Sequence, residues 1–455
     1  MCGLAGIIGF NTDKELNSFK LGCERFLRQR GPDALNHWSS NDGRINLAHA
    51  HLAIVDRSGL GGQPMVSEEL SLTIMLVGEI YNYRELKSHF KDYPYQGDSD
   101  TEVLFPLYYR EGIKGLRRLK GMFTIVIVDT KKKECLLIRD AIGKKPFYVS
   151  QSRGKTFFGS SVLPLLAGGA EQKDTTDEIK KSYMENGFIP YQASANAAFK
   201  TLLPGTYWRL DWNGHLKETG RITPNVTEVF ENESLFEAQK RFNLLFEKAV
   251  YRRLENNPTP TVLLSGGLDS TAIAFALKKV RPRLFTIRSG LPLMNDEFYA
   301  RYAAYRLGLP VEVLSIPWLN KPASVFSCLE KQDEPLGIFS FVPLSQMMQK
   351  VHENARVVLT GDGGDEVLLG YGQTDNWLGG DPHGEDRPWD IGPPPPQWMS
   401  AWGRRAVGAD LAGHGFVKVD RTSAENAVES RAPFLDWDLV TYLRSLPAGY
   451  LLAGG

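Results

Sequence analysis

The chain of 455 residues carries 53 Lys and Arg residues and 53 Asp and Glu residues, so its formal net charge at pH 7 is zero. This balance argues against broad electrostatic attraction to nucleic acid or to an anionic membrane surface. The sequence has no signal-peptide pattern and no apolar run of 18 residues, so we expect a cytoplasmic protein without a membrane partner. Its four cysteines lack CxxC spacing, which argues against a disulfide framework and a zinc site.

The first 205 residues are predicted to be rich in β-strands. Short apolar runs alternate with turns of Gly, Asn and Asp, which is typical of stacked antiparallel sheets. The runs are residues 4–10, 47–55, 72–77, 123–128, 135–138 and 156–158. Helical patterns cover residues 14–29, 82–90, 100–111 and 174–186. A polar stretch follows, and we place a linker at 211–233 between a domain of residues 1–210 and one of residues 234–455.

From residue 234 helices and strands alternate. The expected order is helix 234–255, strand 261–264, a helix, strand 283–287, helix 296–307, and strands 311–316 and 356–359. Such alternation predicts an α/β domain with a doubly wound parallel sheet, in which ligands bind beyond the carboxyl ends of the strands. Residues 372–400, which include four consecutive prolines, are predicted to form an irregular loop.

A glycine-rich turn follows the predicted strand 261–264 and opens a helix. Unpaired N–H groups at such a turn carry the positive end of the helix dipole and form an anion site. The hydroxyls of Ser265 and Ser270 add donors, and an acid at Asp269 is compatible with phosphate when a divalent cation lies between them. The turn lacks the lysine of a P-loop. We therefore predict a site for the pyrophosphate of ATP, formed by Leu264, Ser265, Gly266, Gly267, Leu268, Asp269 and Ser270.

A second glycine-rich loop, residues 360–366, directly follows the predicted strand 356–359. Its three acids repel one another unless a cation offsets them. Parallel strands that end in these two loops can bring Asp269 and Asp365 onto one Mg²⁺, which would neutralise phosphate charge. Both loops together predict an ATP site that contains magnesium.

The amino terminus is the third informative feature. Removal of Met1 leaves Cys2 with a thiol and a free α-amino group whose pKa is about 8. That amine can accept the thiol proton, so one residue supplies nucleophile and base. Three further motifs, at 30–33, 78–82 and 99–102, supply a tight turn and polar groups suited to an amino-acid ligand.

With these motifs in place, the chain resembles the glutamine-dependent asparagine synthetase family. The resemblance runs nearly end to end, through ordered motifs at residues 1–3, 30–33, 78–82, 99–102, 121–123, 139–140, 203–205, 265–270, 333–335, 360–366 and 429–436. It implies an N-terminal-nucleophile glutaminase domain followed by an ATP-pyrophosphatase domain. It also implies that ammonia released from glutamine attacks an acyl-adenylate, giving an amide, AMP and pyrophosphate. The acceptor acid would be aspartate, and a homodimer is compatible with the resemblance.

The resemblance assigns roles to particular residues. Cys2 would be the nucleophile, and Asp362 would assist the step in which ammonia reacts. Asp269 and Asp365 would bind magnesium. Gly78, Glu79 and Asp100 would bind glutamine. Leu264 and Ile287 would contact adenine, and Thr360 and Gly361 would adjoin the rest of the nucleotide.

Three departures from the family pattern bear on activity. His51 stands where an arginine is expected to bind the α-carboxylate of glutamine, and a neutral histidine cannot replace a bidentate guanidinium. Val77 replaces an asparagine that donates to the oxyanion, a loss that costs on the order of 10²–10³ in rate. The sequence also ends before a lysine that offsets charge on pyrophosphate, for which Lys278, Lys279 or Arg421 are the candidate substitutes.

These departures leave two alternatives open beside the main prediction. One is an adenylating ligase that forms another amide or a lactam, with a weakened or lost glutaminase. The other is a catalytically degenerate relative that binds a nucleotide. The departures at His51 and Val77 favour the first alternative, whereas retention of Cys2 opposes it.

Overall fold

A computed structural model describes residues 2–56, 60–189, 192–223, 233–254, 259–288, 296–316, 322–338, 340–370, 399 and 415–452. The chain divides into two compact units. Unit 1 comprises Met1–Pro224 with Lys331–Ile338 and Ala424–Ala427, and unit 2 comprises the remaining residues. Each unit is described by itself below. The expected irregular loop at 372–400 lies outside the described residues except for Met399.

Unit 1 contains two six-stranded antiparallel sheets. Sheet A has the order β10-β8-β9-β1-β3-β2 and sheet B the order β12-β11-β7-β6-β5-β4. The strands of sheet A are β1 (Gly3–Ile8), β2 (Ala34–Ser39), β3 (Ile45–His51), β8 (Tyr148–Ser152), β9 (Lys155–Gly159) and β10 (Lys200–Thr201). Those of sheet B are β4 (Met65–Ser67), β5 (Leu72–Ile80), β6 (Gly121–Asp129), β7 (Glu134–Arg139), β11 (Thr206–Asp211) and β12 (Leu216–Arg221).

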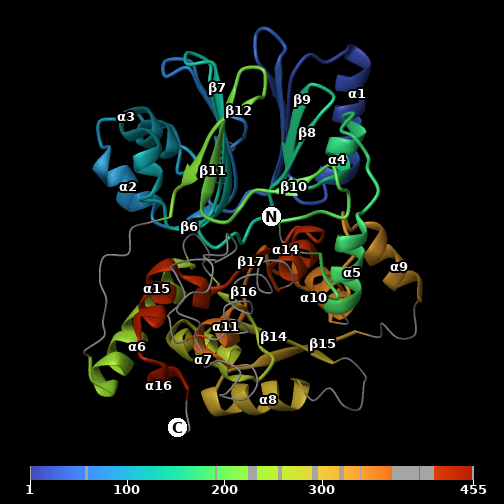
Figure 1. Cartoon of the computed structure of the whole chain (residues 1–455). Coiled ribbons are helices and arrows are strands. Elements are labelled where there is room, and N and C mark those ends of the chain that lie inside the picture. The colour runs from blue at the N-terminus through green and yellow to red at the C-terminus, as the bar shows by residue number, and fades with distance from the viewer. Residues whose placement is uncertain are drawn as a thin grey trace. The chain divides into compact units, whose positions relative to one another are not determined.

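Helices cover the outer faces of both sheets, so unit 1 has four layers. Helices α1 and α4 lie along sheet A, whereas α2 and α3 lie along sheet B (Figure 1). The inner faces pack on each other through a fully apolar cluster that includes Leu4, Leu47, Met75 and Val126. The helices of unit 1 are α1 (Asp13–Gly22), η1 (Cys23–Leu27), α2 (Tyr83–His89), α3 (Leu104–Leu116), α4 (Leu163–Ala167) and α5 (Asp177–Asn186).

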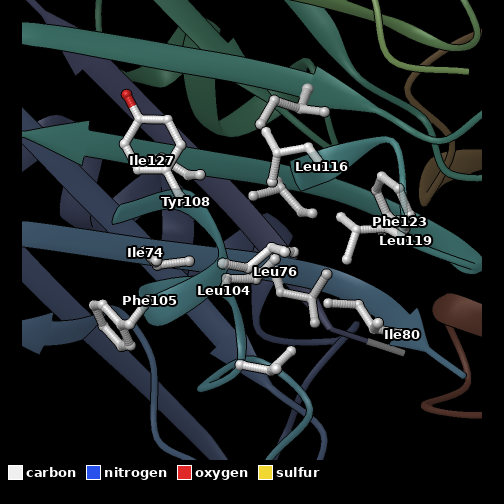
Figure 2. Packing of buried hydrophobic residues seen from close by; sticks show 14 of the residues in the cluster. Ile74, Leu76, Ile80, Leu104, Phe105, Tyr108, Leu116, Leu119, Phe123 and Ile127 are labelled. Atoms are coloured by element: carbon white, nitrogen blue, oxygen red, sulfur yellow. The ribbon is translucent and has the colours of Figure 1, made fainter. Parts of the chain in front are cut away.

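Figure 2 shows how sheet B holds its outer helices. Leu104, Phe105 and Tyr108 of α3 pack on side chains of β5 and β6 such as Ile74 and Ile127. The strands bury both faces, because one face meets these helices and the other meets sheet A. That double burial explains why β5 and β6 are almost continuously apolar in sequence.

Unit 2 is built on a five-stranded sheet of order β15-β14-β13-β16-β17, in which every pair is parallel. From β13 the chain proceeds outward through β14 and β15, then returns to the other side of β13 as β16. The point between β13 and β16 is therefore the topological switch point, where doubly wound sheets bind ligands. The strands are β13 (Thr261–Leu263), β14 (Arg283–Arg288), β15 (Val311–Ser315), β16 (Val357–Leu359) and β17 (Glu429–Arg431).

The helices of unit 2 follow from local capping and apolar spacing. In α6, Ser234 and Glu237 form a capping box, in which the Ser234 hydroxyl accepts from the Glu237 amide and Glu237 accepts from the Ser234 amide. The helices are α6 (Leu235–Arg252), α7 (Leu268–Ala276), η2 (Lys278–Val280), α8 (Asp296–Leu307), α9 (Pro322–Glu330), α10 (Phe341–His352), α11 (Gly364–Leu368), α14 (Phe416–Ala424), η5 (Pro433–Leu435), α15 (Trp437–Ser445) and α16 (Ala448–Leu451).

The expected fold class is confirmed in both halves, and the differences are local. Residues 206–221 form the β11–β12 hairpin of sheet B, so part of the stretch from 211 that the sequence suggested as linker is sheet. The first unit continues to Pro224, and Ile222 packs in its core. Strands β2, β4, β8, β10 and β17 were not predicted. Strand β2 has a polar exposed edge, β17 is a three-residue strand rich in charge, and β4 and β10 have three and two residues. Within the described residues, no helix is long and apolar enough to cross a membrane.

Candidate functional site

Cys2 immediately precedes β1, beside the end of β3. Its Sγ lies 3.3 Å from the Leu52 amide nitrogen, which donates to it, and 3.7 Å from the Leu52 carbonyl oxygen. The Nδ1 atom of His51 is 4.0 Å from the same sulfur. Cys2 as a residue is partly exposed. The structure thus brings Cys2 and His51 together, a contact that the sequence did not predict.

The turn at residues 30–33 fixes this corner of the sheet. Arg30 Nε donates to the Cys2 carbonyl oxygen at 3.2 Å. Asp33 donates its backbone N–H to the His51 carbonyl oxygen and accepts from the Ala53 amide through Oδ2 at 2.8 Å. A Cβ atom at Gly31 would lie 2.4 Å from the Ala50 carbonyl oxygen, so only glycine fits there. This turn therefore positions the residues that surround the Cys2 thiol.

The thiol of Cys2 has a pKa below its ordinary value. Burial raises the pKa, but the neighbouring His49, the positive amino terminus and the Leu52 amide lower it by a larger combined amount. A lowered pKa increases the fraction of thiolate, which is the nucleophilic form. His49 was not among the predicted site residues, although it lies two residues before His51 and therefore on the same face of a strand.

The predicted glutamine-binding residues lie at the end of β5 and after it. Gly78 has a φ of 113°, and a Cβ there would approach the Met122 carbonyl oxygen to 1.9 Å, which excludes other residues. Asp100 accepts from the Ile80 amide at 2.9 Å, so one of its carboxylate oxygens already holds the strand end. Glu79 is buried. Val77 is fully buried in the same inter-sheet cluster against which Cys2 packs, and its side chain offers no hydrogen-bond donor.

In unit 2, the glycine-rich turn between β13 and α7 is ordered by its own serines. The two hydroxyls of Ser265 and Ser270 are 3.1 Å apart, the Ser265 amide donates to Ser270 Oγ, and the Gly267 amide donates to Ser265 Oγ. Gly266 has a φ of 86°, and a Cβ atom would lie 2.3 Å from the backbone of Tyr299 in α8. Ser265, Gly267 and Leu268 are exposed. The turn therefore presents hydroxyl and backbone donors to solvent at the start of a helix.

The two glycine-rich loops meet at Asp269. A Cβ on Gly361 would be 3.0 Å from the Asp269 Cβ, and one on Gly364 would be 2.3 Å from its carboxyl carbon. The pKa of Asp269 is raised to about 6, because burial and the negative charges of Asp365 and Asp362 all disfavour its ionised form. Burial also raises the pKa of Asp365. The charges of Asp365 and Asp362 thus act on Asp269, which a cation would offset.

A buried ion pair supports the loop at 360–366. The guanidinium of Arg431 is fully buried and donates to Glu429 at 2.8 Å, and the Arg431 carbonyl oxygen accepts from the Thr360 amide at 3.0 Å. Leu435 fills the space that a Cβ of Gly363 would occupy. The motif at 429–436 therefore acts structurally here, through the strand β17 beside β16.

The other predicted nucleotide residues lie near the same edge of the sheet. Leu264 is buried and its amide donates to the Phe285 carbonyl oxygen at 2.8 Å. Ile287 is the penultimate residue of β14. Thr360 is buried, and its hydroxyl has no hydrogen-bond partner among the described residues. Lys278 and Lys279 follow the carboxyl end of the nine-residue α7, roughly 13 Å along the axis from the phosphate turn. They are therefore poor substitutes for a cation at that turn.

Comparison with known proteins decides the family. Residues 1–219 match the model of the glutamine amidotransferase domain, and residues 241–406 and 410–455 match the asparagine synthase model. The chain belongs to the glutamine-hydrolysing asparagine synthetase family. The first model thus covers the part of the chain with Cys2, and the second covers the part with Asp269.

Curated members of the asparagine synthetase family align over 82% of this chain. Glutamine-hydrolysing asparagine synthetase 2 of Bacillus subtilis is 28% identical over 400 residues, and asparagine synthetase B of Escherichia coli is 29% identical over 395. A putative asparagine synthetase of Methanocaldococcus jannaschii is 29% identical over 404 residues. The chain spans 53%, 65% and 76% of these relatives, respectively, and thus only about half of the first.

Among solved structures, a glutamine phosphoribosylpyrophosphate amidotransferase of B. subtilis aligns with 79% of this chain and 82% of its own, at 14% identity and a TM-score of 0.38.

Among the described residues, no group of three or more His, Cys, Asp or Glu side chains is arranged as a metal site. A magnesium ion at Asp269 and Asp365 would therefore need ligands from phosphate or water as well.

Proposed function

We propose that the chain catalyses ATP-dependent amide formation with ammonia from glutamine, with aspartate as the acceptor. The observation that carries this proposal is the convergence of the two glycine-rich loops on Asp269 at the switch point of the parallel sheet. The lowered pKa of the Cys2 thiol supports the glutaminase half.

In the proposed reaction, each half has its own residues. The Cys2 thiolate attacks the side-chain amide of glutamine, while Gly78, Glu79 and Asp100 hold the amino-acid end. Leu264, Ile287, Thr360 and Gly361 adjoin the nucleotide, and the Ser265–Ser270 turn binds pyrophosphate. Asp362 assists the ammonia step. Magnesium, when bound by Asp269 and Asp365, would offset phosphate charge. It fits the donor set, because burial and the charges of Asp365 and Asp362 raise the pKa of Asp269 in its absence.

The test measures both halves on the full chain. With glutamine, ATP, Mg²⁺ and aspartate we expect glutamate, AMP and pyrophosphate. Cys2→Ala should abolish glutamate release but leave ammonia-dependent AMP formation, whereas Asp269→Asn should abolish AMP formation with either nitrogen source. Absence of AMP with aspartate and with every acid of a carboxylate panel would contradict the synthetase half.

A second candidate function is an adenylating ligase that joins a different amine or closes a lactam. It is favoured by Val77, a fully buried apolar side chain where an oxyanion donor is expected. The same carboxylate panel separates the two, because this candidate predicts AMP formation that does not depend on glutamine or ammonia. A cytoplasmic location and a homodimer stay predictions from the sequence.

A further inference from the structure

Strand β1, which follows Cys2, pairs with β9 on one side and with β3 on the other. Its register with β9 ends where Ala5 lies opposite Gly159. The next pair in this register is Leu4 and Ser160, at the point where the chain leaves β9 for α4. Leu4 is two residues from Cys2, so this pair lies at the end of the β9 side of β1 that is nearest the thiol.

The hydroxyl of Ser160 replaces one backbone hydrogen bond of that pair. In an antiparallel ladder, two directly opposed residues of this kind exchange both of their N–H···O=C bonds. The Ser160 amide donates to the Leu4 carbonyl oxygen at 2.9 Å, as the ladder requires. The Leu4 amide donates to Ser160 Oγ at 3.0 Å, and this hydroxyl donates to the Leu4 carbonyl oxygen at 3.3 Å. One side chain therefore holds both backbone polar groups of Leu4.

This contact is shielded from water. Ser160 is 1% exposed and Leu4 is 0% exposed. A buried N–H group that loses its acceptor is costly, because no water takes the place of the lost partner. Removal of the Ser160 hydroxyl therefore either leaves the Leu4 amide unpaired or shifts β1 until that amide finds another acceptor.

The segment that follows Ser160 is fixed as well. The Ser161 hydroxyl donates to Asp333 at 2.8 Å, and the Val162 and Leu163 amides donate to the same carboxylate oxygen at 3.1 Å. Because residues 161–163 are held at three points, Ser160 presents its hydroxyl to β1 from a fixed position.

The opposite side of β1 places the thiol itself. Gly3 pairs with β3, and the Leu52 amide beyond the end of β3 donates to Cys2 Sγ at 3.3 Å. Arg30 donates to the Cys2 carbonyl oxygen at 3.2 Å. Hydrogen bonds weaken steeply with distance and misalignment, so a shift of β1 relative to β3 weakens the bond from Leu52 to the sulfur. Since β1 lies between Ser160 and β3, its position depends on both sides.

We propose that Ser160 is a positioning residue for the Cys2 nucleophile. This inference rests on the proposed glutamine hydrolysis. By holding Leu4, the hydroxyl keeps the start of β1 against β3, so that the thiol and the α-amino group of Cys2 meet a bound amide in the geometry that the reaction needs. Ser160 acts through the backbone of β1 and not on the reacting atoms.

The test compares Ser160→Ala with wild type in the full chain. We expect kcat for glutamine hydrolysis to fall about tenfold and KM to change by less than about twofold, because a displaced nucleophile affects the transition state more than substrate binding. Ammonia-dependent AMP formation should be unchanged. Ser160→Thr keeps the hydroxyl and should restore kcat. The matched control is Ser150→Ala, because Ser150 is 2% exposed in β8 and its hydroxyl bonds to Ser152.

A second readout needs no glutaminase activity. Alkylation of Cys2 by iodoacetamide, followed against pH by peptide mass spectrometry, reports the thiolate fraction, and the buried Cys23 and Cys135 are internal references. Ser160→Ala should slow alkylation at pH 7 roughly threefold, the change for a rise of about half a unit in the thiol pKa when the Leu52 donor is less well placed.

Wild-type kcat together with a wild-type alkylation profile in Ser160→Ala would overturn the proposal. If this variant loses thermal stability, Ser160→Cys answers the same question, because a thiol of similar size is a weaker hydrogen-bonding group. Absence of glutamate release by the wild type would overturn the proposed function instead. The alkylation profiles would then still decide whether Ser160 positions the thiol.

Discussion

At the scale of single residues, Asp269 is surrounded by glycine because a larger residue would displace it. The carboxyl carbon of Asp269 lies where a Cβ of Gly364 would be, at 2.3 Å. A side chain there must move the acid by roughly an ångström, and such misplacements of a site can cost about 10²-fold in rate. The glycines of the loop at 360–366 thus affect the site by leaving room for Asp269 of the other glycine-rich loop.

We therefore expect Gly364→Ala to lower ammonia-dependent pyrophosphate formation by about 10²-fold, while glutamate release from glutamine is unchanged. Gly449→Ala is the matched control, because a Cβ at Gly449 meets nothing within 4 Å. Equal pyrophosphate formation by Gly364→Ala and wild type would show that Asp269 does not depend on this contact.

The raised pKa of Asp269 predicts how cation binding depends on pH. Its value of about 6 in the folded chain exceeds the ordinary value of about 3.9, so the ionised acid destabilises the fold above about pH 6, and this effect is absent below about pH 4. A divalent cation must displace the proton. We expect Mn²⁺ affinity, measured by calorimetry, to rise between about pH 5 and 7 and this rise to be lost in Asp269→Asn; a flat profile in the wild type would contradict the shared cation site.

At the scale of elements, the three-residue strand β17 supports the loop at 360–366 through a buried ion pair. Arg431 and Glu429 are 0% and 2% exposed in their side chains. Removing one partner of such a pair leaves the other charge buried without compensation. Because Arg431 also accepts from the Thr360 amide, loss of β17 would release the loop at 360–366.

Glu429→Ala should accordingly destabilise the chain by about 3–5 kcal/mol in denaturant unfolding, and Glu429→Gln should do so less because it keeps an acceptor. Glu353→Ala removes an exposed ion pair with Lys350, whose side chains are 59% and 54% exposed, and should cost under about 1 kcal/mol. Similar losses in Glu429→Ala and Glu353→Ala would contradict the role of burial.

At the scale of the whole molecule, unit 1 includes a segment that comes late in the sequence. Within Lys331–Ile338, Asp333 accepts from the Ser161 hydroxyl and from the Val162 and Leu163 amides at the start of α4. Glu334 accepts from the Tyr148 hydroxyl and the Ala195 amide. Some hydrogen-bond donors of the first 224 residues therefore find their acceptors in this later segment.

Asp333→Ala should lower the stability of unit 1 by about 1–2 kcal/mol, the usual cost of losing a helix cap. The measurement is denaturant unfolding of the full chain, followed by protection of the α4 amides from hydrogen exchange. Asp333→Asn keeps a side-chain acceptor and should lose less. Unchanged protection of α4 in Asp333→Ala would show that the segment does not stabilise unit 1.

The sequence by itself determined the two fold classes, most strands, the helices α1–α3 and α5–α8, and both glycine-rich loops. These features depend on local periodicity and on turns such as Gly266, where only glycine fits. It could not place β2 or β17, whose polar or short sequences form strands only because neighbouring strands pair with them.

Only the tertiary structure decided which side chains meet. It placed Asp269 between two glycines of a loop more than 90 residues away, and it joined Asp333 to a helix of unit 1. It also set His51 beside the Cys2 sulfur, where the sequence had assigned a ligand for a carboxylate. Contacts of this kind depend on strand order and loop path, which no local pattern encodes, so the chemistry around Cys2 could be read only from the fold.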